Sequence, residues 1–285
     1  VKVNAGASNT CRRYKVMTSQ QIKRVLTILT VSLMAAVSWA GDDDVVQSVG
    51  HGQVHWGDNT VTATGSGAPS LKAANVAVAR LGAERAAKMD AFRNILETVK
   101  GVRLSSGQSV SAMMDTSPQL KSRVEGVLRS FKVVDTRYYS DGGVDVVVQA
   151  PLTGVILDAL LPKAGSSEDK AAVAVSEHTG LVVNARGLAL TPAISPRLVD
   201  EDGNVIYSAA FVNRDAALQR GIATYHKSVD AATKSKRVAT KPVLVKAVKL
   251  AAPGSSDLVI SAADLAKVAS AKNALQQGRI VIVVD

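Results

Sequence analysis

Two histidines four residues apart, His51 and His55, are the first side chains in the sequence that could do chemistry, because imidazole nitrogens are common ligands of transition metals. A stable metal site needs at least a third ligand, and the glycine-rich stretch around the two histidines is a poor helix former. We therefore interpret residues 41–59 as a flexible arm, solvated or covering an interface, rather than as a metal site.

Three further patterns fall short of a catalytic or cofactor site. The glycine turn expected at residues 65–67 resembles a dinucleotide-binding turn, but Ser70 stands where the third glycine is required. The acidic turn at residues 200–204 lacks the remaining calcium ligands, including a distal glutamate. Asp135 and Asp145 fall on paired strands and could form an acid–base couple, although solvated strand positions explain them more simply. We expect a protein that is not an enzyme and has no cofactor and no metal.

One segment of the second half is rich in basic residues, and its only acidic residue after Asp215 is Asp230. Two interpretations remain open, a solvated face or a contact for an anionic ligand such as phosphate-bearing lipid or acidic glycan. The candidate contact residues are Lys227, Lys234, Lys236, Arg237 and Lys241, with Lys246 and Lys249 farther along the chain.

The first 40 residues have the pattern of a secretory leader. Residues 17–40 contain a basic start, an apolar core too short to span a bilayer comfortably, and small residues at the end. We expect signal cleavage between Ala40 and Gly41, with a retained membrane anchor as the alternative, and we interpret residues 1–16 as an upstream extension of the reading frame. The protein is then exported, to the periplasm or to a position on the outer membrane.

The leader also dominates the charge of the chain. It holds six of the 34 lysines and arginines and none of the 24 acidic residues, so the remainder has 28 basic against 24 acidic residues, a net charge of +4. Nucleic acid is therefore not an expected partner. Cys11, the only cysteine, lies in the leader, so the mature chain is expected to fold without disulfides or thiolate metal sites.

A single long helix between two strands is predicted within residues 61–104. Pro69 suits its first turn, and Lys100 followed by Gly101 suits its end. Apolar residues at three- and four-residue steps predict its packed face: Leu71, Ala74, Val78, Leu81, Met89, Phe92, Leu96 and Val99. Small residues near its middle would let another backbone approach closely, and we expect them to serve self-association: Gly82, Ala83, Ala86 and Ala87.

The remaining patterns predict an α+β protein with two small domains. The first, residues 60–162, reads as strand, long helix, strand (residues 102–104 and 108–112), a helix that starts at Ser117-Pro118, a hairpin around residues 141–143 and a closing helix, with the long helix on a short mixed sheet. Residues 163–178 have the composition of a linker. Residues 179–285 alternate strands and helices and predict a second α/β domain whose strand order the pattern leaves open. Its β-branched run at residues 280–284 predicts a strand buried on both faces.

The order of elements in the first domain, together with the helix sequence AAKMDAFRNILETVKGVRL, resembles the bacterial outer-membrane lipoprotein family of about twenty kilodaltons. That family includes FlgP-type flagellar disk proteins and the N-terminal domain of FlgT-type flagellar ring proteins. The resemblance covers about residues 58–162 and implies an envelope protein that packs side by side into rings or disks. Family lipoproteins carry a cysteine at the cleavage site, where this chain has Gly41.

Three functional hypotheses follow. The first is a non-enzymatic envelope component that forms a homo-oligomer, alone or with other envelope or flagellar basal-body proteins, and packs through its long helix, the edge of its hairpin or its N-terminal arm. The second is a periplasmic binding module that uses the basic segment to hold acidic glycan or outer-membrane lipid. The third is an enzyme of unknown type, which ranks last because the chain lacks a catalytic constellation.

Overall fold

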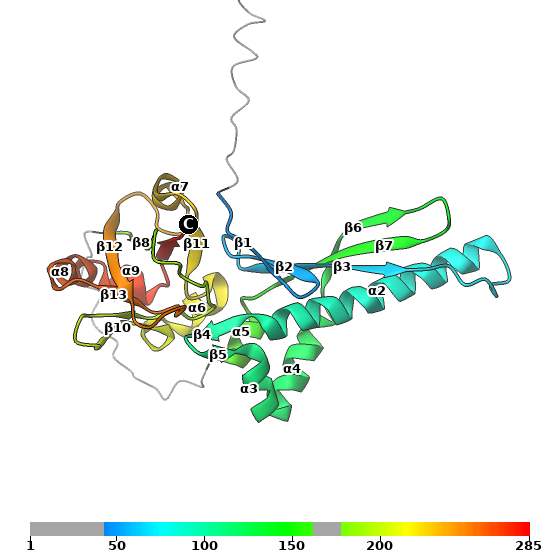
Figure 1. Cartoon of the computed structure of the whole chain (residues 1–285), viewed down its shortest axis with the longest axis horizontal. Helices are drawn as coiled ribbons and strands as arrows, with labels where there is room; N and C mark the ends of the chain where they lie inside the picture. The colour runs from blue at the N-terminus through cyan, green and yellow to red at the C-terminus, as the bar shows by residue number, and fades with distance from the viewer. Residues whose placement is uncertain (1–42, 162–177) are drawn as a thin grey trace, which may run out of the picture. The chain divides into compact units, whose positions relative to one another are not determined.

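The computed structural model describes residues 43–161 and 178–285. The predicted leader, including the Ala40–Gly41 cleavage site, and nearly all of the predicted linker lie outside the described residues. The described residues form an α+β structure with one long helix on a sheet and a second, separate sheet (Figure 1).

The first sheet has five strands in the order β1-β2-β3-β7-β6. Every pair of neighbouring strands is antiparallel, so this sheet is not the mixed sheet that we expected. The long helix α2 (Val76–Gly101) packs on β3 and β7 (Figure 1). The strands are β1 (Val46–Val49), β2 (Gly52–His55), β3 (Thr60–Gly67), β6 (Lys132–Tyr138) and β7 (Val144–Pro151).

The predicted flexible arm is wrong for the part that the structure describes. Residues 46–55 form a tight hairpin, β1 against β2, and β2 continues the sheet by pairing with β3. The glycine-rich composition concealed a short alternation of buried and exposed residues that is typical of a strand. Within it, Val54 and Trp56 point into the core and are fully buried. The Trp56 indole nitrogen donates to the Gln47 side chain at 3.0 Å, which ties the two strands together.

The glycines at positions 65 and 67 do not make a turn, contrary to the prediction. They lie inside β3, where α2 approaches so closely that a β-carbon on Gly65 would fall 2.0 Å from the main-chain nitrogen of Ala91. A β-carbon on Gly67 would fall 2.0 Å from the carbonyl oxygen of Ala83. Because these two glycines lack a β-carbon, the helix backbone can pack directly against β3. The helix also begins later than predicted, with Asn75 as its N-cap.

This close approach decides which face of α2 is buried. The buried positions are Ala83, Ala87, Ala91, Ile95, Thr98 and Val99, a row at four-residue steps that begins with three alanines. Most of the predicted apolar stripe points elsewhere, because only small side chains fit between the two backbones. Leu71, Val78, Leu81 and Met89 are exposed, and of that stripe Val99 is fully buried.

Three short helices belong to the first half of the chain, and the first two of them pack on α2. The predicted strand at residues 108–112 is largely helical instead, whereas the helix predicted after Ser117-Pro118 is present and Ser117 caps it. They are α3 (Val110–Thr116), α4 (Pro118–Leu128) and α5 (Val155–Leu160), and a small hairpin, β4 (Arg103–Ser105) with β5 (Gln108–Ser109), precedes them. The hairpin predicted around residues 141–143 is confirmed as β6 and β7.

The second sheet has seven strands in the order β10-β9-β13-β12-β8-β14-β11. Strands β12, β8, β14 and β11 are parallel, and β14 is buried along its whole length, as its run of β-branched residues predicts. The strands are β8 (Gly180–Asn184), β9 (Leu198–Val199), β10 (Val205–Tyr207), β11 (Thr224–His226), β12 (Pro242–Leu250), β13 (Leu258–Ile260) and β14 (Ile280–Val283). The helices are α6 (Arg214–Arg220), α7 (Val229–Lys234), α8 (Ala262–Ser270) and α9 (Lys272–Gln276), with a 3-10 turn η2 (Ala209–Phe211).

Residues of the connection between β2 and β3 bond directly to the second half of the chain. The Trp56 carbonyl accepts from the Tyr225 main-chain nitrogen at 3.2 Å, and the two rings meet edge to face with centroids 5.4 Å apart. The Asn59 side chain donates to the carbonyls of Arg220 and Ala223 at 3.3 and 3.1 Å. One continuous set of buried side chains therefore runs through both sheets.

Candidate self-association surface

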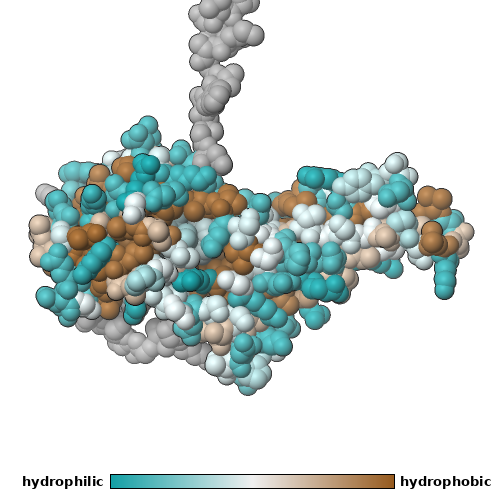
Figure 2. Space-filling view, viewed as in Figure 1, coloured by the Kyte–Doolittle hydropathy of each residue, from teal (hydrophilic) through white to brown (hydrophobic). Residues whose placement is uncertain are grey.

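The outer face of α2, defined by Val78, Leu81, Gly82, Arg85, Ala86 and Met89, is exposed along its length. Leu81 and Met89 leave 57% and 65% of their surface open to solvent, which is high for side chains of this size on a helix that already buries another face. Leu71, which precedes the helix, and Val76, the first residue of α2, are still more exposed. Figure 2 shows apolar surface over this end of the molecule, where α2 begins.

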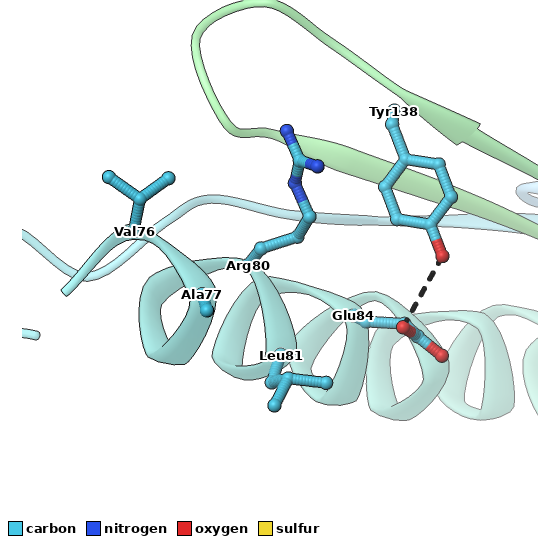
Figure 3. A pocket seen from close by; sticks show the side chains of 6 residues that line it. All are labelled: Val76, Ala77, Arg80, Leu81, Glu84 and Tyr138. Atoms are coloured by element: carbon cyan, nitrogen blue, oxygen red, sulfur yellow. Dashed lines mark hydrogen bonds between the residues drawn. The ribbon is translucent and has the colours of Figure 1, made fainter.

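A shallow groove lies between α2 and β6. Its lining residues are Val76, Ala77, Arg80, Leu81 and Glu84 from the helix and Tyr138 from the strand (Figure 3). The Arg80 guanidinium lies 5.6 Å from the centre of the Tyr138 ring, a cation–π contact. The Tyr138 hydroxyl donates to the Glu84 carboxylate at 3.4 Å, and the Lys88 ammonium donates to it at 2.6 Å. The hydrogen bond from Lys88 is the main cause that lowers the pKa of Glu84.

Strand β6 is the outermost strand of the first sheet, and helix α2 covers β3 and β7 instead. Six of its seven residues are exposed, including Val133, Val134 and Tyr138. A register shift between Val133 and Asp135 marks a bulge in its first half. On the face away from α2, Arg137 donates to Asp135 at 2.9 Å. The β6 edge, its row of main-chain groups turned away from β7, is thus accessible to another strand.

The structure divides the four small residues predicted for self-association. Ala83 and Ala87 are fully buried against β3, so packing within the chain already uses them. Gly82 and Ala86 are exposed on the outer face of α2, and a β-carbon on Gly82 would meet open space. The self-association prediction is therefore left with Gly82, Ala86 and their larger exposed neighbours.

The basic segment is only partly a free charged surface. Lys234, Lys236 and Lys241 are exposed, whereas Lys227 is half-buried and its main-chain nitrogen donates to the Asp43 carbonyl at 3.2 Å. Lys246 and Lys249 lie on β12, and both are exposed. The three lysines at residues 234–241 are exposed, so an anionic ligand in solution can reach their ammonium groups.

Arg237 does not belong with these lysines, which corrects the predicted ligand set. The half-buried Arg237 side chain donates from its guanidinium to the carbonyls of Arg220 and Gly221, the latter at 2.7 Å, and so closes the C-terminal end of α6. Burial lowers the pKa of Arg237 to about 10. Arg237 therefore stabilises the fold, and it is not available to an external anion.

The histidines and acidic residues considered as sites have partners within the chain. His51 pairs with Glu97 at 3.4 Å, and the His55 Nδ1 atom lies 3.0 Å from Asp44. Both carboxylate oxygens of Asp200 accept hydrogen bonds from residues of its own turn. Within the two described ranges, no group of three metal-binding side chains is found.

The two carboxylates considered as an acid–base couple are held apart by different partners. Asp135 pairs with Arg137, and Asp145 accepts from the hydroxyls of Ser66 at 2.6 Å and Tyr139 at 2.7 Å. These hydrogen bonds, that of Ser66 first, lower the pKa of Asp145. Asp145 thus links β7 to β3 and to the end of β6, whereas Asp135 is paired within its own strand.

Reasoning from the sequence named the hairpin edge as one possible self-association surface but missed the groove. The sequence did contain part of the signal. The glycines at 65 and 67 and the alanines at 83, 87 and 91 indicate a close contact between strand and helix. That contact fixes the buried face of α2 and leaves the apolar stripe outside. The position of β6 at the edge depends on strand order, which periodicity does not reveal.

None of the helices described is both long enough and apolar enough to cross a membrane. Comparison with protein families gives two matches in different parts of the chain. Residues 57–151 match the LPP20 lipoprotein family, and residues 180–285 match the second domain of Treponema pallidum Tp0624. A comparison with curated proteins gives no match. The first match is a likeness of residues 57–151 to bacterial lipoproteins. This likeness supports an exported protein that associates with the cell envelope.

Proposed function

We propose that this protein is a non-enzymatic structural component of the cell envelope that associates with copies of itself. The observation that carries the proposal is the exposed outer face of α2, where Leu81 and Met89 remain open after the helix has buried its alanine row. Apolar side chains that line one face of a long helix favour burial against a partner. The envelope likeness of residues 57–151 supports the location.

The non-enzymatic part is supported by the roles of the ionisable groups whose pKa is shifted. Glu84 bonds to Lys88, Asp145 to Ser66 and Asp158 to Arg214, and each of these contacts joins two elements or two turns of one helix. These partners account for the shifts without a catalytic role.

The test is the native mass of the protein and of variants on the outer face of α2. We expect the wild-type protein to oligomerise in a concentration-dependent manner, and Leu81→Ser with Met89→Ser to shift it toward monomer. Val155→Ser, which changes an equally exposed apolar residue on α5, is the matched control and should leave the mass unchanged. Unchanged oligomers in the double variant would refute the role of this face, and a wild-type monomer at high concentration would refute self-association.

A flagellar location is the finer form of this proposal and rests on the resemblance to flagellar disk and ring proteins. Imaging of the tagged protein in intact cells would test it. Foci at flagellar bases support the flagellar form, and a uniform envelope signal contradicts it.

The alternative function, a binding module for acidic glycan or lipid, is favoured by the three exposed lysines Lys234, Lys236 and Lys241. Its test is sedimentation with phosphatidylglycerol vesicles of the wild-type protein and of a variant with all three lysines changed to glutamate. Arg237 must stay unchanged in this test, because its loss would disturb α6 rather than a ligand contact. Equal binding by both proteins would eliminate this alternative.

A further inference from the structure

The main-chain groups of β6 that face outward can be assigned from its pairing with β7. The Tyr139 nitrogen donates to the Gly143 carbonyl at 2.9 Å, so these residues form a hydrogen-bonded pair. Such pairs alternate along an antiparallel ladder, and therefore Arg137 and Asp135 bond to β7. Thr136 and Tyr138 consequently turn their N–H and C=O groups toward the free edge of the sheet.

The charges of β6 select one way in which two copies of this edge can pair. An antiparallel pairing in which Thr136 faces Thr136 of the second copy places Asp135 opposite Arg137 twice, once on each side of the two-fold axis. Moving the register by two residues in one direction sets Asp135 against Asp135. Moving it in the other direction sets Arg137 against Arg137. Like charges directly opposite destabilise a strand pair, so the register centred on Thr136 is favoured.

We infer that two copies of the chain pair through β6 in this register and form one continuous ten-stranded sheet. The inference rests on the proposed function of self-association and names the surface and geometry of one contact. The bulge between Val133 and Asp135 confines the pairing to the second half of the strand. Opposite residues of an antiparallel pair share a face, so both α2 helices lie on the same side of the joined sheet.

This geometry also accounts for the exposed groove. Tyr138 lies on the α2 side of β6, because it pairs with the buried residue Val144. In the paired sheet, Tyr138 of each copy lies on the α2 side, two residues from the central pair of Thr136 residues. The two grooves then flank the seam between the copies, bounded by the two α2 helices.

A charge exchange between copies tests the register. Asp135→Arg gives a chain with two positive charges at the seam, and Arg137→Asp gives a chain with two negative charges. Each variant alone should associate about tenfold or more weakly than the wild type, because both opposite pairs become repulsive. Mixing the two variants should restore association as a heterodimer, measured by native mass spectrometry with one variant isotopically labelled.

The ion pair within one chain cannot produce that restoration, because each variant lacks it in the mixture as well. A second measurement uses Thr136→Cys in a Cys11→Ser background, where oxidation should link two chains because opposite α-carbons of a bonded pair lie about 5.5 Å apart. Ser48→Cys on the opposite edge strand, β1, is the matched control and should link far more slowly.

The outcomes separate this inference from the function on which it rests. A wild-type protein that oligomerises but shows no preference for the mixed pair, and no faster linkage at residue 136 than at residue 48, overturns the β6 pairing alone. A wild-type protein that remains monomeric at every concentration overturns both. Preferential heterodimers together with the link at residue 136 support the register.

Discussion

The main-chain nitrogen of Ala91 in α2 lies 2.0 Å from the point that a β-carbon on Gly65 in β3 would occupy. No rotamer can relieve a contact between a β-carbon and a backbone atom, so any larger residue must push the helix away from the sheet. We expect Gly65→Ala to destabilise the protein by about 3 kcal/mol or more, measured by urea unfolding.

Gly82→Ala is the matched control for that change, since it adds the same methyl group to α2 where nothing lies within 4 Å. We expect it to stabilise the protein by about 1 kcal/mol, because alanine favours the helix and glycine does not. Equal effects of the two substitutions would contradict the close packing of β3 and α2.

Arg237 provides a second prediction. Arg237→Ala removes the hydrogen bonds to the Arg220 and Gly221 carbonyls and should reduce the free energy of unfolding by roughly 1.5–3 kcal/mol. Lys236→Ala, an exposed neighbour, should change it by less than about 0.5 kcal/mol. Thermal unfolding followed by circular dichroism compares the two variants. Similar losses in the free energy of unfolding would mean that Arg237 is a solvated surface residue like its neighbouring lysines.

His226 makes stability depend on pH near neutrality. Burial lowers the pKa of His226 below its ordinary value, against the opposing charges of Asp43, Asp44 and Asp58, and its Nδ1 atom has no hydrogen-bond partner among the described residues. The unfolded chain therefore binds the proton more readily than the folded one. Stability from this group is present above the unfolded pKa of about 6.5 and is lost as the pH falls through the lower folded value.

The expected result is that the wild-type melting temperature falls more steeply between pH 7 and pH 5 than that of His226→Gln, which cannot be protonated. Parallel curves for the two proteins would show that His226 titrates alike in the folded and unfolded states.

Asp158 makes stability depend on pH in the acid range. Hydrogen bonds from Arg214 first, and then from Arg123, lower the pKa of Asp158 and link α5 to α6 and α4. Its contribution is complete above the unfolded pKa of about 3.9 and disappears as the pH falls through the lower folded pKa. Asp158→Asn should therefore melt at a lower temperature than the wild type at pH 6. The difference between the two melting temperatures should shrink as the pH falls toward 2.5.

Asp115→Asn, at an exposed position of α3, is the matched control for Asp158→Asn and should follow the wild-type curve. A constant gap between Asp158→Asn and the wild type over the whole range would mean that the carboxylate charge plays no part.

Local patterns predicted the elements whose residues respond mainly to their neighbours in sequence. The β6–β7 hairpin follows from the Asp141-Gly142-Gly143 turn, α4 from its cap Ser117, and the buried strand β14 from consecutive β-branched residues. In each of these the local preference and the tertiary environment agree, so periodicity was sufficient.

The errors come from positions that tertiary contacts decide. The face of α2 that is buried depends on Gly65 and Gly67, which lie at least 16 positions earlier in the sequence than Ala83 and act only through space. Arg237 looked like its neighbouring lysines until the end of α6 was placed beside it. For the same reason, Ala83 and Ala87, which were predicted to serve self-association, are buried within the chain, whereas most of the stripe expected to be buried is exposed.

The bonds from Trp56 and Asn59 to residues 220–225 span more than 160 positions of the chain. A chain made from its N-terminus cannot form them until nearly four fifths of its length has emerged, so the Trp56 ring lacks its partner Tyr225 until then. The vulnerable period is therefore synthesis itself, when a holdase that shields the indole would protect the chain from premature association.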